Sequence, residues 1–168
     1  SIKLGMLFSS FLAAIITEPI MCNSGCVLPE PDFLQGLRET TEKYGMALIF
    51  DEVITGFRTA LGGAQQYYGV KPDLSIFAKA MASGFPISAI AGKKQWMQLV
   101  ADSRVIHAGT MNSACTLIAA ALGTLEVLEE SGAFDGQMED AMDWYKTFQG
   151  KIITANTKKD NANKTTIK

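Results

Sequence analysis

The chain has 168 residues, of which 48% are apolar and 19% are charged, and its formal net charge is −2. This is enough apolar material for a sizeable core, so the composition excludes disorder for most of the chain and favours about one domain. The slightly acidic balance argues against nucleic-acid binding. The N-terminal apolar run "KLGMLFSSFLAAII" is too short to span a membrane, and we expect a buried strand there behind a truncated or irregular end.

The cysteine content is low and odd in number, with Cys22, Cys26 and Cys115. Such a count indicates free thiols in a reducing compartment, so we expect the protein in the cytoplasm or another reducing intracellular compartment. Cys22 and Cys26 have the spacing of half a metal site. With His107 and one further cysteine as the remaining candidates, the sequence favours ordinary loop or buried cysteines over zinc, and we expect no metal centre.

Apolar and amphipathic segments alternate along the chain and predict an ordered series of elements. In chain order we expect a strand at 13–20, a loop at 22–31, a helix at 32–45, a strand at 46–53, a loop with one helical turn at 62–73, strands at 74–81 and 87–92, and helices at 94–102, 113–131 and 136–148. Asp32 suits the N-cap of the first helix and Gly45 its C-cap.

Strands that are apolar throughout and separated by helices predict an α/β fold, with a mainly parallel sheet and helices on both faces. Glu18, Asp51 and Lys79 each lie near the carboxyl end of a predicted strand. Ligands bind beyond the carboxyl ends of strands in such sheets, so three ionisable side chains are expected to converge on one crevice. Taken singly, each of them also fits ordinary polar punctuation at a strand end.

Lys79 lies in a stretch from Leu74 to Gly92 that has no other charged residue. We therefore expect it to be desolvated, which favours the neutral amine. A neutral amine is a nucleophile that forms a Schiff base with a carbonyl compound. The small residues at 80 and 82–84 leave room for a flat, bulky group, although a purely structural lysine is the alternative.

Four segments together resemble the middle of a class-III aminotransferase, a pyridoxal-phosphate (PLP) enzyme of fold type I. They are "AAIITEPI", "LIFDEVITGFR", "GGAQQYYGVKPDLSIFAKAMASGFPISAIAG" and "HAGTMNS", and the resemblance covers about residues 13–131. The stretch "GGAQQYYGVKPDL" is close to the glutamate-1-semialdehyde aminomutase branch. The segment after Lys79 is less rich in glycine than in the aminomutase, which favours a related aminotransferase.

The resemblance implies a set of cofactor-binding residues. Lys79 would hold the cofactor as a Schiff base and then act as the general base, and Asp51 would face the pyridine nitrogen. Val53 would pack on the ring face, from the same side of the strand as Asp51. Thr110 would reach the cofactor phosphate of a partner subunit, which implies a homodimer. Glu18 would lie near the cofactor and the substrate-side gate.

Glu52 differs from its neighbour Asp51 in this scheme. It points to the opposite side of the predicted strand, so we assign it no cofactor contact. A structural ion pair is its expected role.

The resemblance also predicts a division of the chain. Residues 1–112 would be part of the PLP-binding large domain, 113–131 a long connecting helix, 132–150 the start of a C-terminal small domain, and 151–168 a disordered or aberrant tail. The family's earlier Gly-rich phosphate loop, its ring-stacking aromatic and its substrate-carboxylate arginine have no counterpart here. We therefore expect the chain to be a fragment of a longer enzyme.

The function implied is transamination, in which an amino group moves from an amino acid or amine to an oxo acid. Small-molecule donor and acceptor are then the expected partners. An aminomutase, which returns the amino group to the same carbon skeleton, is the alternative within enzymes. A non-catalytic remnant or interaction fragment without a complete cofactor site is the alternative of another class, and cofactor loading separates it from the first two.

Overall fold

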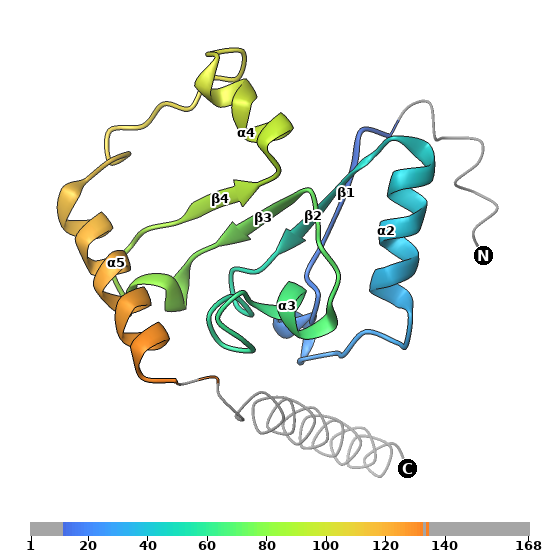
Figure 1. The fold of residues 1–168 in the computed structure, drawn as a ribbon, viewed down its shortest axis with the longest axis horizontal. Helices are drawn as coiled ribbons and strands as arrows, with labels where there is room; N and C mark the ends of the chain where they lie inside the picture. Colours follow the sequence, from blue (N-terminus) through green and yellow to red (C-terminus); the bar gives the residue numbers. More distant parts are fainter. Residues whose placement is uncertain (1–11, 133, 135–168) are drawn as a thin grey trace, which may run out of the picture.

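The computed structural model describes residues 12–132 and 134. Its elements are three 3₁₀ or short helices, three longer helices and four strands, shown in Figure 1. They are β1 (Ala14–Thr17), η2 (Cys22–Ser24), α2 (Phe33–Tyr44), β2 (Ala47–Asp51), α3 (Ala64–Tyr68), β3 (Leu74–Phe77), η3 (Lys79–Ala82), β4 (Ala89–Gly92), α4 (Lys94–Ala101) and α5 (Cys115–Glu130). The expected helix at 136–148 and tail at 151–168 lie outside the described residues.

The four strands form one sheet in the order β1-β2-β3-β4. The first three are parallel, and β4 is antiparallel to β3, with Ala89 opposite Phe77. The connection between β3 and β4 holds η3 and a short loop, without the longer helical crossover that a parallel pair needs. The predicted mainly parallel α/β class is therefore confirmed, with one antiparallel edge strand.

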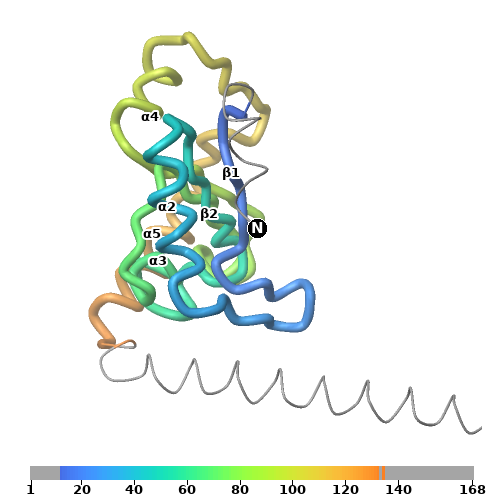
Figure 2. The backbone as a smooth tube through the Cα atoms, turned by 90° about the vertical axis from the view of Figure 1, so that its right-hand side faces the viewer, coloured from blue at the N-terminus to red at the C-terminus, as the bar shows by residue number. Residues whose placement is uncertain are grey.

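One face of the sheet packs against α2 and carries the main core. Leu48 and Phe50 of β2 are fully buried and contact Leu34 of α2 and Val70, which follows α3. Alternation along β2 sends these two side chains to one face and Ile49 and Asp51 to the other. Figure 2 shows α2 beside β1 and β2 on this single side.

The ends of α2 follow the sequence expectation in part. Gly45 is the C-cap with φ 67°, and its N–H donates to the carbonyls of Thr41 and Glu42. This left-handed conformation suits glycine, so that prediction is confirmed. Asp32 occupies the N-cap position, but its side chain makes no capping hydrogen bond.

A buried carboxylate joins three parts of the fold. Asp73 accepts hydrogen bonds from Arg38 of α2 at 2.9 Å and from the backbone N–H of Leu48 in β2 at 2.8 Å. Its other oxygen lies 2.8 Å from Nζ of Lys93, just after β4. Burial alone would raise the pKa of Asp73, but these hydrogen bonds and the charge of Arg38 outweigh burial and lower it.

The opposite face of the sheet is open among the described residues. Ile16 pairs in register with Ile49, and Ile90 pairs with Ile76, which pairs in turn with Asp51. Ile16 is 60% exposed and Ile90 is 56% exposed, so the described helices leave both side chains largely uncovered. This open face is the one that carries Asp51.

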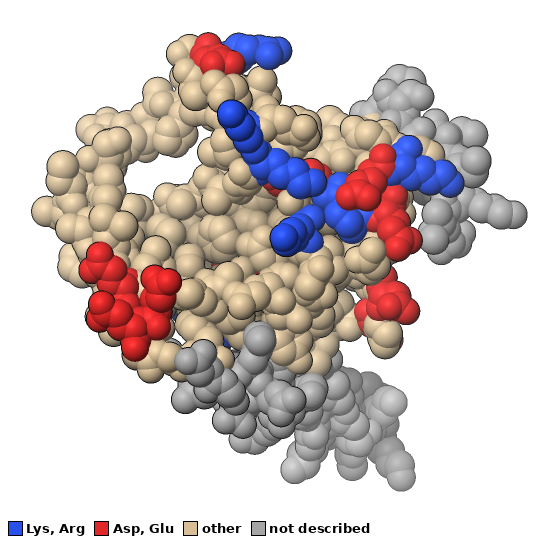
Figure 3. Space-filling model, viewed as in Figure 1, with Lys and Arg blue, Asp and Glu red and all other residues tan. Residues whose placement is uncertain are grey.

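A second core cluster forms at the end of β3. Phe77 packs with Met81 and Ala82 of η3 and with Ala121 of α5. Between α4 and α5, residues 102–113 are exposed, and Figure 1 shows this segment arching away from the sheet. The space-filling view shows an opening between this arch and the strands (Figure 3). Within residues 12–132 and 134, no helix has both the length and the apolar character needed to cross a membrane.

Candidate active site

Three ionisable residues lie at one edge of the sheet, as the sequence predicts. Glu18 directly follows β1, Asp51 is the last residue of β2, and Lys79 lies two residues beyond β3. These strands are parallel neighbours, so their carboxyl ends meet at the same edge. The local contacts of the three side chains nevertheless differ.

Asp51 presents a carboxylate whose orientation is fixed by its own backbone. Its Oδ1 accepts a hydrogen bond from the N–H of Val53 at 3.0 Å, and the side chain is half-buried. Its Oδ2 has no hydrogen-bond partner among the described residues. The structure thus supplies one oriented acceptor at the sheet edge, which is what a protonated ring nitrogen requires.

The position of Val53 differs from the sequence expectation. β2 ends at Asp51, and Val53 lies in the turn that follows. The alternation of side chains along a strand therefore does not place Val53 beside Asp51, and the argument from strand geometry is wrong. The N–H of Val53 orients Asp51, while its contact with the cofactor ring remains a prediction.

Glu52 is fully buried, and its contacts within residues 12–132 and 134 are hydrogen bonds in place of the expected ion pair. Its carboxylate accepts hydrogen bonds from the hydroxyl of Thr55 and from the backbone N–H groups of Ala64 and Gln65, at 2.8 and 2.7 Å for the two N–H groups. The last two belong to the first turn of α3. Burial raises the pKa of Glu52, while these hydrogen bonds oppose the rise.

Lys79 begins η3 in the left-handed region of backbone space, with φ 48°. A residue other than glycine with this backbone conformation is strained by about 1 kcal/mol or more, and such residues are frequent at functional sites. The sequence predicts a desolvated lysine, but Lys79 is exposed in this chain. The strand ends at Phe77, earlier than predicted, so the uncharged sequence around Lys79 does not enclose it.

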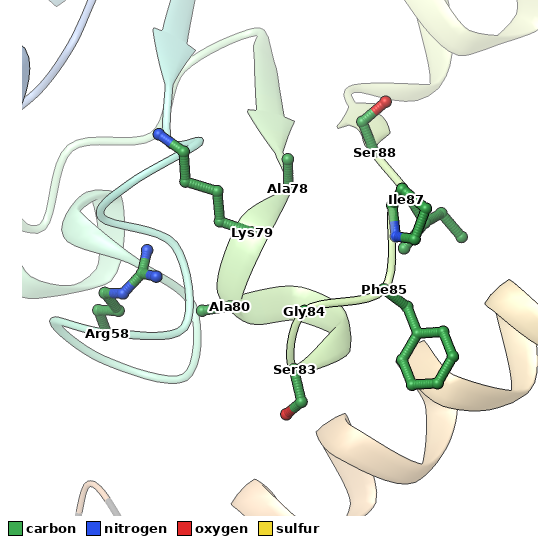
Figure 4. A pocket seen from close by; sticks show the side chains of 10 residues that line it. Arg58, Ala78, Lys79, Ala80, Ser83, Gly84, Phe85, Ile87 and Ser88 are labelled. Carbon is green, nitrogen blue, oxygen red and sulfur yellow. The ribbon is translucent and has the colours of Figure 1, made fainter.

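The side chain of Lys79 lines a pocket of about 700 Å³. Figure 4 shows its side chain extending across the end of the neighbouring strand in that view, with small residues beneath it. The lining combines two cations, two hydroxyls, small residues and apolar residues: Arg58, Lys79, Ser83, Ser88, Ala78, Ala80, Gly84, Phe85, Pro86 and Ile87. This composition suits a molecule with an apolar or flat body.

Arg58 is a charged residue of this pocket that the sequence analysis did not assign to the site. It lies in the turn between β2 and α3, and its Nη1 donates to the carbonyl of Ile54 at 2.7 Å. The turn is tightly packed: a Cβ on Gly56 would meet the ring of Phe77 at 2.5 Å, and one on Gly63 would meet the Glu52 carboxylate at 2.6 Å. The sequence shows a cation shortly after the strand, but its position depends on this turn.

Glu18 and Thr110 do not line the Lys79 pocket. Glu18 accepts hydrogen bonds from the N–H of Cys22 at 3.1 Å and from Nδ2 of Asn23 at 3.4 Å, which shape the η2 turn. Thr110 is exposed in the turn that precedes α5. Their predicted cofactor contacts, like those of Asp51 and Lys79, stay predictions.

Comparison with known proteins shows what this chain resembles in sequence. Residues 4–159 match the family model "Aminotransferase class-III". The chain is 49% identical over 124 residues to glutamate-1-semialdehyde 2,1-aminomutase of Thermodesulfovibrio yellowstonii, covering 73% of this chain and 29% of that protein. It is 50% identical over 137 residues to glutamate-1-semialdehyde 2,1-aminomutase 2 of Brevibacillus brevis, covering 80% and 32%. The chain thus spans about a third of the length of these relatives.

Solved structures show the same likeness in three dimensions. An omega-transaminase from Sphaerobacter thermophilus superimposes with a TM-score of 0.70 at 37% identity, covering 75% of this chain and 30% of that one. A transaminase with PLP bound superimposes with a TM-score of 0.71 at 27% identity, covering 76% and 31%. In sequence the chain therefore resembles proteins named as aminomutases, and in backbone it resembles proteins named as transaminases.

Proposed function

Because the chain belongs to the class-III aminotransferase family, we propose that it is part of a PLP-dependent enzyme that moves an amino group from an amino acid or amine to an oxo acid. The observation that carries this proposal is the position of Lys79. Its amine is exposed at the carboxyl edge of a mainly parallel sheet, opens into a pocket, and lies one strand away from the oriented carboxylate of Asp51.

The residues present suit the cofactor. Lys79 forms no ion pair with any carboxylate in the described part of the chain, so its amine is available to hold an aldehyde. Asp51 offers a carboxylate oxygen that no described donor occupies. When bound, PLP supplies an electron sink that stabilises negative charge at the substrate carbon.

Each residue then has a distinct task. The Nζ of Lys79 would hold the cofactor and, once released, carry a proton to and from the reacting substrate carbon. The carboxylate of Asp51 would keep a proton on the ring nitrogen, and the N–H of Val53 would hold that carboxylate in place. Thr110, carried on the exposed arch, would contact the phosphate in a partner subunit of a homodimer.

The test is reductive labelling of the purified 168-residue chain with PLP and borohydride, followed by peptide mass mapping. We expect the main adduct on Lys79 and its loss in Lys79→Ala. Lys94→Ala removes an exposed lysine outside the pocket and serves as the matched control. Label spread evenly over exposed lysines would contradict the proposal and favour a non-catalytic fragment without a formed cofactor site.

Intramolecular amino transfer of the aminomutase type is the second candidate. It is favoured by the relatives near 50% identity, which are named glutamate-1-semialdehyde 2,1-aminomutases. Such an enzyme converts glutamate 1-semialdehyde to the isomer with the amino group moved from carbon 2 to carbon 1, with no second oxo acid. Turnover of the PLP-loaded protein on that single substrate would favour the aminomutase, and a requirement for an added oxo acid would favour the transaminase.

A further inference from the structure

Among the described residues, those that line the Lys79 pocket include a second cation and no acid. Arg58 lines it together with Lys79, and the other lining residues in the described part of the chain are neutral. A lining of this kind favours a positive potential inside the pocket, because none of the described residues that line it is a carboxylate. We propose that Arg58 binds an anionic group, a carboxylate or a phosphate, carried by the carbonyl compound that reacts at Lys79. This inference rests on the proposed function of Lys79.

The anchoring of Arg58 supports this role. One of its donors, Nη1, bonds to the carbonyl of Ile54, which fixes the direction of the side chain. The guanidinium forms no ion pair with a carboxylate in residues 12–132 and 134. Its remaining N–H donors are therefore available to an incoming anion, and the planar fork matches the paired oxygens of a carboxylate or phosphate.

The walls of the pocket complete the site. Figure 4 shows Arg58 and Lys79 on one side, with Phe85, Ile87 and Ser88 across from them. The apolar side chains give the body of a bound molecule a surface to contact, and they also strengthen the attraction between the cations and an anion by displacing water. A ligand of this site has a carbonyl carbon for Lys79 and an anionic end for Arg58.

The tight turn explains why Arg58 is held at this place. Gly56 lets the turn approach Phe77 of β3, and Gly63 lets it approach the buried Glu52. Glu52 bonds to the first turn of α3, so both ends of the turn are fixed. Arg58 and Lys79 therefore line one pocket because of the way this loop folds.

The test measures capture of aldehydes at Lys79. The Nζ forms a bond to the carbonyl carbon, the carbonyl oxygen leaves as water, and borohydride donates a hydride to the resulting C=N bond, leaving a stable secondary amine. Four probes form two pairs that differ in an anionic group: 4-oxobutanoate and butanal, and pyridoxal 5′-phosphate and pyridoxal. The measured quantity is the aldehyde concentration that half-labels the Lys79 peptide.

The variants separate charge from structure. Arg58→Gln removes the charge and keeps a donor for Ile54, while Arg58→Lys retains a charge. Arg104→Gln removes an exposed arginine outside the pocket and is the matched control. We expect Arg58→Gln to raise the half-labelling concentration about three- to tenfold for an anionic probe and to leave its neutral counterpart unchanged, since a partly exposed charge-assisted bond has modest strength. Arg58→Lys should recover part of the loss.

The outcomes distinguish the sources of the anion. A loss confined to 4-oxobutanoate assigns Arg58 to a carboxylate, and a loss confined to pyridoxal 5′-phosphate assigns it to a phosphate. Equal labelling of wild type and Arg58→Gln by all four probes overturns the inference while leaving the function of Lys79 intact. Absence of labelling at Lys79 with every probe overturns both proposals.

Discussion

At the scale of single residues, the adjacent carboxylates Asp51 and Glu52 show how one peptide bond separates two environments. Asp51 faces the open side of the sheet and keeps an oxygen free of described donors. Glu52 faces inward and accepts three hydrogen bonds from Thr55, Ala64 and Gln65. The first is therefore suited to bind a ligand, and the second to hold the loop that carries Arg58.

Removing the Glu52 carboxylate should unfold this loop first. We expect Glu52→Ala to lower the free energy of unfolding by about 2–4 kcal/mol, because two backbone N–H groups and a hydroxyl lose their acceptors in a buried site. Urea unfolding of both proteins measures this change. Glu39→Ala, at an exposed position of α2, is the control and should change stability by less than about 0.5 kcal/mol. An equally small effect at Glu52 would contradict the structural role.

The raised pKa of Glu52 gives this residue a signed pH dependence. Its folded-state pKa lies above the ordinary value of 4.5, so the folded chain holds the proton more tightly than the unfolded chain. The resulting stability is fully present below about 4.5 and is lost as pH rises through the folded pKa. Glu52→Gln cannot titrate, so its stability should fall less over that window than wild type. Parallel curves would contradict the assignment.

At the scale of elements, Asp73 links α2, β2 and the residue after β4 through a single carboxylate. Its partners Arg38, Leu48 and Lys93 come from segments far apart in the sequence. Arg38 is nearly buried, whereas the Lys93 side chain is 45% exposed. The two ion pairs therefore contribute unequally to stability. Water screens the exposed pair with Lys93, whereas the buried Arg38 charge depends on Asp73 as its partner.

Asp73→Asn should destabilise the chain by about 2–4 kcal/mol at neutral pH, because it leaves the buried Arg38 charge without its main partner. Lys93→Gln should cost less than about 1 kcal/mol. Since the pKa of Asp73 is lowered from its ordinary 3.8, its stabilisation is present above that value and is lost as pH falls through the folded pKa. Thermal unfolding from pH 7 down to pH 2 measures this, and a constant difference between wild type and Asp73→Asn would contradict it.

At the scale of the whole molecule, the sheet is asymmetric among the described residues. One face is closed by α2 and the core around Leu48 and Phe50, while Ile16 and Ile90 are exposed on the other. Figure 3 also shows acidic residues gathered over the carboxyl-terminal part of α5, where Glu126, Glu129 and Glu130 are exposed. The open apolar face is more unusual for a protein surface than the acidic patch, because an apolar sheet face usually packs against another layer of structure.

The asymmetry predicts opposite responses to substitution on the two faces. Ile16→Thr and Ile90→Thr should reduce binding of a hydrophobic dye and self-association of the chain, at a stability cost below about 1 kcal/mol. Leu48→Ala should cost about 2–5 kcal/mol because it opens a cavity in the core. Dye fluorescence, light scattering and urea unfolding measure the three properties. Unchanged dye binding after both isoleucine substitutions would show that this face is covered in solution.

The fold class, most elements and a set of candidate site residues could be predicted from the sequence alone. Strand and helix periods depend on neighbouring residues, and the strand-end positions of Glu18, Asp51 and Lys79 follow from them. The motifs around Lys79 also indicated the family, and the match of the family model to residues 4–159 confirms this prediction. These features are local in the chain, so local patterns suffice to predict them.

The ends of the strands and the contacts of the side chains could not be predicted from the sequence, because both depend on tertiary packing. β2 and β3 end earlier than predicted, because the chain turns at the sheet edge, and this places Val53 in a turn and leaves Lys79 exposed. Three features join residues that are distant in sequence or separated by a loop: the burial of Glu52 against α3, the link through Asp73, and the pocket that Arg58 and Lys79 both line. Their partners are selected by packing in three dimensions, which no local pattern specifies.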